Sequence, residues 1–445
     1  MDSRDAPIAP TFWQALLYWL KLGCISFGGP AGQIAMMHEE LVERRRWISE
    51  QRFLHALNYC MLLPGPEAQQ LATYIGWLLH KRWGGLVAGG LFVLPSLLLL
   101  MALSWLYMRF GSTPAVAAAL YGIKPAVTAI VLAAAHRIGG RALKNTPLKG
   151  IALAAFVAIF ALNLPFPLIV LGAALIGHLG GRWAPEAFRL GGGHGSAPAK
   201  SHAPALIDDD TPTPAHARFS WSGFARMLLA GLALWALVLG ALVALQGRNG
   251  PLTQMAWFFT KAALLTFGGA YAVLPYVYQG AVEHFQWLSA AQMMDGLALG
   301  ESTPGPLIMV VSFVGFVGGW GQALYGPDAL LAAGIAGATV VTFFTFLPSF
   351  VFIFLGGPFI ESTHGKLQFT APLTAITAAV VGVILNLALF FAWHVLWPAG
   401  WQGPFEWPSA LIGVAALVAL IRFKVGVMTV VGGALLAGLA LQWLR

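Results

Sequence analysis

Residues 21–66 of this chain align without a gap with residues 261–306, and twelve of the 46 positions are identical. The identical positions include a lysine in an apolar run, a Phe-Gly-Gly triplet, a tryptophan and a Pro-Gly-Pro triplet. Lysine, glycine and proline are not typical of an apolar helix, so shared hydrophobicity does not explain the match. The match continues where Leu94-Pro95-Ser96 returns as Leu347-Pro348-Ser349. Repetition of this kind indicates a duplicated structural unit, and the fold must accommodate two homologous halves.

The composition indicates that most of this chain lies in a lipid bilayer. Hydrophobic residues make up 58% and charged residues 9% of the sequence, and the mean hydropathy is +0.75. These values predict an all-α polytopic membrane protein with about 10–13 membrane segments. The net charge of +8 fits Lys and Arg gathered in cytoplasmic loops, so no nucleic-acid partner is expected. The two cysteines have neither metal-ligand nor redox spacing.

The chain divides by composition and by the repeat. The segment between the halves is rich in Gly, Pro, Ser and Asp, which predicts a disordered cytoplasmic linker. One apolar helix after it has no counterpart in the first half. The expected parts are a tail (1–10), a first repeat (11–183), the linker (184–220), an unmatched transmembrane helix (221–248) and a second repeat (249–445).

Loop charges predict that the two halves have opposite orientations in the membrane. Several first-half loops are basic, whereas their second-half equivalents contain no Lys or Arg. By the positive-inside rule the repeats are inverted, and the unmatched helix performs the inversion. The N-terminus and linker are then cytoplasmic and the C-terminus periplasmic. The bias is weak in the loops that hold Arg109 and Lys366. The basic loops are 44–52, 81–82 and 137–149, and their equivalents are 284–288, 318–327 and 395–407.

Glycine and proline triplets interrupt the short helices of both halves. Inverted repeats with broken or re-entrant short helices are typical of secondary transporters, whose site lies between the repeats. A helix that begins at such a break directs free N–H groups at an anion. The alternative is that the triplets are tight turns and packing notches. The predicted substrate-binding residues at the breaks are Ser26, Phe27, Gly28, Gly29, Pro64, Gly65, Pro66, Thr266, Gly268, Gly269, Pro304 and Gly305.

Lys21 and Lys261 are predicted to supply positive charge to the substrate. Each lies in an apolar helix shortly before a Phe-Gly-Gly triplet. A lysine inside the membrane costs about 2.5–3.5 kcal/mol on insertion scales, which favours a functional role. The alternative is that both snorkel to an interface. Lys124, directly before Pro125, is a further candidate of the same kind.

Three acidic residues close to the breaks are candidates for proton coupling. Glu67 directly follows Pro66, and Asp295 and Glu301 precede Pro304. Each could titrate during transport. Glu67 has an equal alternative, because an acidic residue at that position can cap a helix.

These residues make the sequence resemble the chromate ion transporter family in its long, two-domain form. The resemblance covers nearly the whole chain apart from the first ten residues and the linker. It implies export of chromate from the bacterial cytoplasm across the inner membrane, chromate resistance, and coupling to the proton gradient, with sulfate as the natural competitor. The second half departs from the first, with Ala270 where Pro30 stands and Leu307 where Glu67 stands, so the half-sites are expected to be unequal. The motifs that carry the resemblance are 27–30, 46–48, 63–74, 122–126, 267–269 and 303–306.

Other function classes remain open at this stage. Uptake of sulfate or another oxyanion, and an anion channel, fit the same pattern. An integral-membrane enzyme acting on a lipid phosphate is disfavoured, because the sequence has no interfacial cluster of acid–base or metal-ligating residues. No catalytic residue, metal or cofactor is expected. The expected partners are a chromate-like or sulfate-like oxyanion and the lipid bilayer, and homodimerisation is left open.

Overall fold

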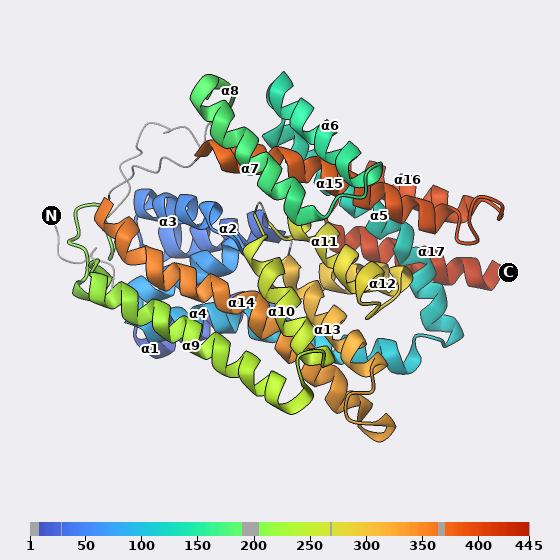
Figure 1. The fold of residues 1–445 in the computed structure, drawn as a ribbon, viewed down its shortest axis with the longest axis horizontal. Coiled ribbons are helices and arrows are strands. Elements are labelled where there is room, and N and C mark those ends of the chain that lie inside the picture. Colours follow the sequence, from blue (N-terminus) through green and yellow to red (C-terminus); the bar gives the residue numbers. More distant parts are fainter. Residues whose placement is uncertain (1–8, 28, 189–203, 268, 364–369, 445) are drawn as a thin grey trace.

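The computed structural model of this protein describes residues 9–27, 29–188, 204–267, 269–363 and 370–444, and in these ranges the chain is helical (Figure 1). Six of the described helices are long and apolar enough to cross a membrane, and four shorter helices are also apolar. The first half contains α1 (Phe12–Ile25), α2 (Gly29–His38), η2 (Glu39–Arg44), α3 (Glu50–Leu62), α4 (Glu67–Phe110), α5 (Pro114–Ala142), α6 (Thr146–Phe160) and α7 (Phe166–Trp183).

The second half repeats this order after α8 (Pro185–Phe188), η3 (Ala215–Ala217) and α9 (Trp221–Gln246). Figure 1 places α9 at the edge of the bundle beside α14, and no residue of α9 is buried. The repeated elements are α10 (Pro251–Leu264), α11 (Ala270–Tyr278), η4 (Gln279–His284), α12 (Ala290–Glu301), η5 (Leu307–Met309), α13 (Val310–Gly321), η6 (Pro327–Ala329), α14 (Leu330–Thr363), α15 (Thr370–Leu396), α16 (Trp407–Ile421) and α17 (Val427–Leu444).

The duplicated sequence produces duplicated local structure. Ser49 and Ser289 cap α3 and α12, because each hydroxyl accepts a hydrogen bond from a backbone N–H in the first turn. A π-helical turn ends α2 and α11 alike, and the residues that follow, Arg46 and Gln286, have φ angles of 52° and 53°. The expected interruptions are present too, since α1 is separated from α2 and α10 from α11 at the glycine pairs.

The long helix α4 is two helices joined at a sharp break. His80 and Lys81 have non-helical backbone angles, and Lys81 has a φ of 56°. In the second half the same place is occupied by the turn between α13 and α14.

The two halves interlock through their C-terminal helices. Helix α5 of the first half packs against α16 and α17, while α15 of the second half packs against α6 and α7. Glycines allow the close approach: a Cβ on Gly122 would stand 2.1 Å from the Ala434 carbonyl oxygen, and one on Gly382 would stand 2.0 Å from that of Ala152. Small residues at such crossings let membrane helices pack backbone to backbone.

Gly122→Val is expected to destabilise the protein, because the new side chain cannot enter the α5–α17 contact without moving backbone. Overpacking of this kind costs about 1–3 kcal/mol. Thermal unfolding of the purified protein in detergent measures the effect. Gly140→Val is the matched control in the same helix, since a Cβ there meets nothing within 4 Å. Equal melting temperatures for the two variants would contradict the packing role of Gly122.

The linker is more ordered than the sequence predicted. Residues 189–203 lie outside the described part, but residues 185–188 form α8, and the segment 204–220 contacts both the first half and α14 of the second half. Ile207 pairs with Ile48 in a parallel β-bridge and is buried. Apolar side chains within the polar linker thus supply the burial that a disordered segment lacks.

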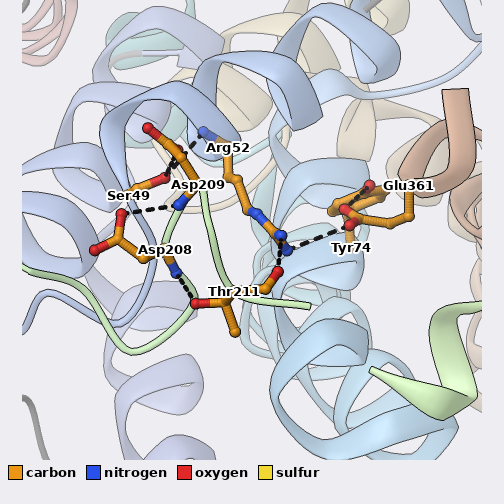
Figure 2. A network of polar contacts seen from close by, with 7 residues as sticks. All are labelled: Ser49, Arg52, Tyr74, Asp208, Asp209, Thr211 and Glu361. Carbon is orange, nitrogen blue, oxygen red and sulfur yellow. Dashed lines mark hydrogen bonds and ion pairs between the residues drawn. The ribbon is translucent and has the colours of Figure 1, made fainter. Parts of the chain in front are cut away.

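A polar network fastens the docked linker to both halves (Figure 2). The guanidinium of Arg52 in α3 donates to the Thr211 carbonyl and forms an ion pair with Glu361 at the end of α14, at 3.4 Å. The Tyr74 hydroxyl donates to the other oxygen of that carboxylate at 2.6 Å. Nearby, the Ser49 hydroxyl donates to Asp209 of the linker. The buried Glu361 carboxylate therefore joins α3, α4 and α14, and Arg52 extends this network to the linker.

Candidate anion site between the halves

The helix breaks of the two halves bind each other reciprocally. The amide of Gly65 donates to the carbonyl of Thr266 at 2.7 Å, and the amide of Gly305 donates to the carbonyl of Ser26 at 2.8 Å. Gly65 and Gly305 have φ angles of 131° and 101°, a conformation that glycine adopts without strain. Each Pro-Gly-Pro turn is thereby joined to the break that follows the first helix of the opposite half.

Ser26 and Thr266 have backbone roles at this junction. Both side chains are buried. The Ser26 hydroxyl donates to the Leu22 carbonyl at 2.5 Å, and the Thr266 hydroxyl donates to the Ala262 carbonyl at 2.7 Å. These bonds satisfy carbonyls at the ends of α1 and α10, where the helical ladder stops. The hydroxyls act as helix terminators, and the carbonyls of the same residues accept from the other half.

Gln33 is a member of the junction that the sequence reasoning missed. Its buried amide nitrogen donates to the Ser26 carbonyl at 3.1 Å and to the Gly305 carbonyl at 2.7 Å. Val273 occupies the equivalent position in the second half. The only signal in the sequence was a glutamine inside the apolar segment that follows a Gly-Gly-Pro break.

Two serine hydroxyls lie against the paired glycines. A Cβ on Gly65 would stand 2.4 Å from the Ser349 Oγ, and a Cβ on Gly305 would stand 2.7 Å from the Ser96 Cβ. Both hydroxyls are buried and have no hydrogen-bond partner among the described residues. A hydroxyl is a donor that can rotate toward a ligand. The duplicated Leu-Pro-Ser motif was the available signal for these two residues.

Three glutamine amide oxygens near the junction are also buried without a partner in the described chain, those of Gln33, Gln69 and Gln70. The amide nitrogen of Gln70 donates to the Pro64 carbonyl at 2.9 Å, and that of Gln69 donates to the Thr73 hydroxyl at 3.0 Å. Buried polar groups normally have partners, so such a collection is unusual. Within the described chain, these oxygens and the Ser96 and Ser349 hydroxyls leave polar groups of both halves free to bind a ligand at the junction.

The two Gly-Gly breaks have different surroundings. A Cβ on Gly29 would stand 3.3 Å from Leu307, the residue that replaces Glu67 in the second half, whereas a Cβ on Gly269 would meet nothing within 4 Å. Open space therefore remains at the N-terminus of α11. Gly28 and Gly268 lie outside the described residues.

The remaining predicted break residues have simpler positions. Phe27 is 39% exposed. Pro66 immediately precedes α4 and is buried, with an extended backbone. Pro304 lies in the turn between α12 and η5. The two prolines therefore lie at helix ends, and Phe27 lies at the surface.

One predicted lysine is paired with one predicted acid. Lys124 of α5 lies 3.7 Å from the carboxylate of Asp295 in α12, and the Tyr107 hydroxyl of α4 donates to the same carboxylate oxygen at 2.9 Å. The Lys124 side chain is 29% exposed and that of Asp295 is 4% exposed. The second carboxylate oxygen is buried without a partner among the described residues. This ion pair joins the two halves.

The other two acids have different environments. Glu301, near the end of α12, accepts a hydrogen bond from the Tyr271 hydroxyl of α11. Glu67 is the first residue of α4, directly after the Pro-Gly-Pro turn. Both lie beside a break, as the sequence predicted.

The structure does not bring Lys21 and Lys261 into the junction. Both are exposed. Lys21 lies on the face of α1 that also exposes Leu17 and Ile25, opposite the buried Trp19. The Lys261 ammonium lies 6.0 Å from the ring centroid of Trp257, which is half exposed. This placement differs from the expectation that two ammonium groups approach one central site, and it fits amphipathic side chains that reach toward an interface.

Comparisons with known proteins place these features in a family. Residues 13–178 and 253–439 match the family described as chromate transporter. The chromate transport protein of Pseudomonas aeruginosa is 33% identical over 98% of this chain and 94% of its own length. The chromate transport protein of Cupriavidus metallidurans is 31% identical over 97% and 94%, respectively. A probable chromate transport protein of Synechococcus elongatus is 28% identical over 91% and 88%. No solved structure matches the chain.

Proposed function

The chain belongs to the chromate transporter family and is a multi-pass membrane protein, and from this premise we propose that it exports chromate from the bacterial cytoplasm. Export would proceed across the inner membrane, confer chromate resistance and be driven by the proton gradient. The main observation in support of the site is the reciprocal pair of backbone hydrogen bonds, from Gly65 to Thr266 and from Gly305 to Ser26. It unites motifs from both halves at one junction.

The proposed mechanism is alternating access between inverted repeats. The reciprocal contacts and the exchanged C-terminal helices support a pseudo-two-fold relation of the halves. The loop charges support opposite orientations, with the N-terminus and linker cytoplasmic and the C-terminus periplasmic. In such transporters one repeat rocks against the other around a fixed site. The oxyanion would bind the Ser96 and Ser349 hydroxyls and the amides at the start of α11.

Uptake of radiolabelled chromate into everted membrane vesicles tests this proposal. Everted vesicles expose the cytoplasmic face, so export appears as uptake. With the interior acidic and the membrane potential clamped by potassium and valinomycin, proton antiport predicts accumulation above equilibrium that excess sulfate reduces. Vesicles without the protein are the control. Equal chromate content in both would reject chromate export.

A second candidate, proton-coupled uptake of an oxyanion, is favoured by the pair of Lys124 and Asp295. An ionised Asp295 competes with a bound oxyanion for the ammonium. Protonation of Asp295 would release Lys124 for the anion, so proton and anion would be bound together and move in the same direction. Accumulation in right-side-out vesicles with an acidic exterior, and not in everted ones, would select this function.

Lys124→Met is expected to reduce chromate transport at least about tenfold, because it removes a positive charge and leaves Asp295 buried without its cation. Asp295→Asn is expected to retain chromate exchange but lose acceleration by the pH gradient. Both are measured in the vesicle assay at matched expression.

The Lys21→Met, Lys261→Met double variant is the matched control for removal of lysines from apolar helices. If the double variant transports normally and Lys124→Met does not, Lys124 supplies the positive charge that binds the substrate. If the double variant loses transport and Lys124→Met transports normally, the exposed Lys21 and Lys261 supply that positive charge instead.

A further inference from the structure

A cavity of about 180 Å³ lies away from the junction, where the end of the linker meets the first turns of α9. Its walls include Arg82 of α4, Arg218 of the linker and Arg226 of α9, together with His216. No Asp or Glu is among the described residues that line it. Three arginines, all of them exposed, thus line one concave space without an acidic neighbour among the described residues.

The three arginines have no ionic partner among the described residues. None of them takes part in a salt bridge, and the one side-chain bond recorded for them is from Arg226 Nε to the Ser222 carbonyl in the same helix, at 3.2 Å. By contrast Arg44, Arg45 and Arg52 are each paired with glutamates. Like charges gathered without compensation repel each other, so an anion that binds all three would relieve that repulsion.

The position of the cavity indicates which anion reaches it. Helix α9 has 26 residues, is strongly apolar and buries none of them, so the part of its surface that does not pack against α10 and α14 is suited to contact lipid. Trp221 at its start is 77% exposed, and Trp83 beside Arg82 is 73% exposed. Exposed tryptophans at the ends of apolar helices mark the head-group level of a bilayer. The cavity therefore opens where lipid phosphates lie.

We propose that this three-arginine cavity binds the phosphate of an anionic phospholipid. Arginine suits this ligand because its planar fork donates two parallel hydrogen bonds to phosphate oxygens. Basic pockets next to membrane helices on the cytoplasmic side are known to hold such head groups. The contact of the His216 ring with the Trp77 carbonyl at 3.0 Å fixes the linker wall of the cavity. The lipid would thus tie the linker and α9 to α4.

The test compares lipid binding by the purified full-length protein and its variants in detergent. Native mass spectrometry and thermal unfolding are recorded with phosphatidylglycerol, with phosphatidylcholine and with inorganic phosphate alone. The cavity variant carries Arg82→Gln, Arg218→Gln and Arg226→Gln. The charge-matched control carries Arg109→Gln, Arg182→Gln and Arg248→Gln, which are exposed and lie outside the cavity lining. The single variant Arg218→Gln is used if the triple variant does not fold.

The expected result is preferential binding of phosphatidylglycerol to the wild type and the control. Affinity should be roughly tenfold or more lower in the cavity variant, and about fivefold lower in Arg218→Gln. Equal loss in the control and cavity variants would overturn the proposal, because the effect would be general charge. Stabilisation by inorganic phosphate alone, with no further gain from phosphatidylglycerol, would also overturn it in favour of a soluble oxyanion.

Discussion

Gly65→Val will reduce chromate transport to background while the protein still inserts into the membrane. At a φ of 131° a β-branched residue is strained, and its Cβ would stand 2.4 Å from the Ser349 Oγ and 2.6 Å from the Gln70 Nε2. Relief of these contacts must displace the turn whose amide donates to Thr266. Chromate uptake into vesicles at matched expression measures the loss.

Gly90→Val is the matched control in α4, because a Cβ at that position meets nothing within 4 Å. It should transport chromate normally. Gly305→Val, at the equivalent turn, should fail as Gly65→Val does, whereas Pro64→Ala should lose less, since a helix can begin without proline. Normal transport by Gly65→Val would show that the reciprocal turns do not form the substrate path.

The equivalent test at the Gly-Gly breaks separates backbone strain from crowding. Gly29→Val and Gly269→Val both place a side chain at positive φ, but only the first meets a neighbour, Leu307. Both should abolish transport if backbone strain at these breaks is the cause, because both replace a glycine at positive φ. Failure of Gly29→Val alone would point to packing against Leu307.

Arg52→Ala will lower the melting temperature by about 3–5 °C, because it leaves the Glu361 carboxylate buried without its cation. The Arg52 and Glu361 side chains are only 12% and 7% exposed, and the same guanidinium holds the linker through the Thr211 carbonyl. Figure 2 shows how these groups converge with Tyr74. Thermal unfolding of the purified protein measures the change.

The control is Arg44→Ala, which removes an arginine from a glutamate pair with side chains 66% and 54% exposed. An exposed pair contributes about 0–1 kcal/mol, so the melting temperature should hardly change. The double variant Arg52→Ala, Glu361→Gln should regain part of the loss, since no buried charge is left unpaired. Equal effects of Arg52→Ala and Arg44→Ala would mean that the Figure 2 network does not stabilise the fold.

The interruptions of the helices were predictable because their causes are local. Glycine pairs, Pro-Gly-Pro turns and the Ser49 and Ser289 caps act through the backbone of the residues next to them. Because these motifs are repeated in the sequence, the breaks, caps and π-helical turns are repeated in the structure. The family resemblance rested in part on these glycine and proline motifs and was confirmed by the match of both halves.

The ordering of the linker was not predictable from composition. Its polar, proline-rich character favours disorder when it is considered alone. Ile207 becomes buried only because the loop around Ile48 offers an open backbone edge and an apolar surface. That surface is assembled from residues distant in the chain.

The sequence by itself determined the membrane environment, the duplication and the helix breaks at the Gly-Gly and Pro-Gly-Pro motifs, because composition and local backbone preference suffice for them. The tertiary structure alone decided which side chains meet. Helices α1 and α10 are mostly apolar, so their composition fitted burial in the protein as well as exposure to lipid, and only the packing decided that Lys21 and Lys261 face outward. Long-range packing of α5 against α12 instead paired Lys124 with Asp295. The reciprocal bonds of Gly65 and Gly305 likewise exist only because the two halves fold against each other.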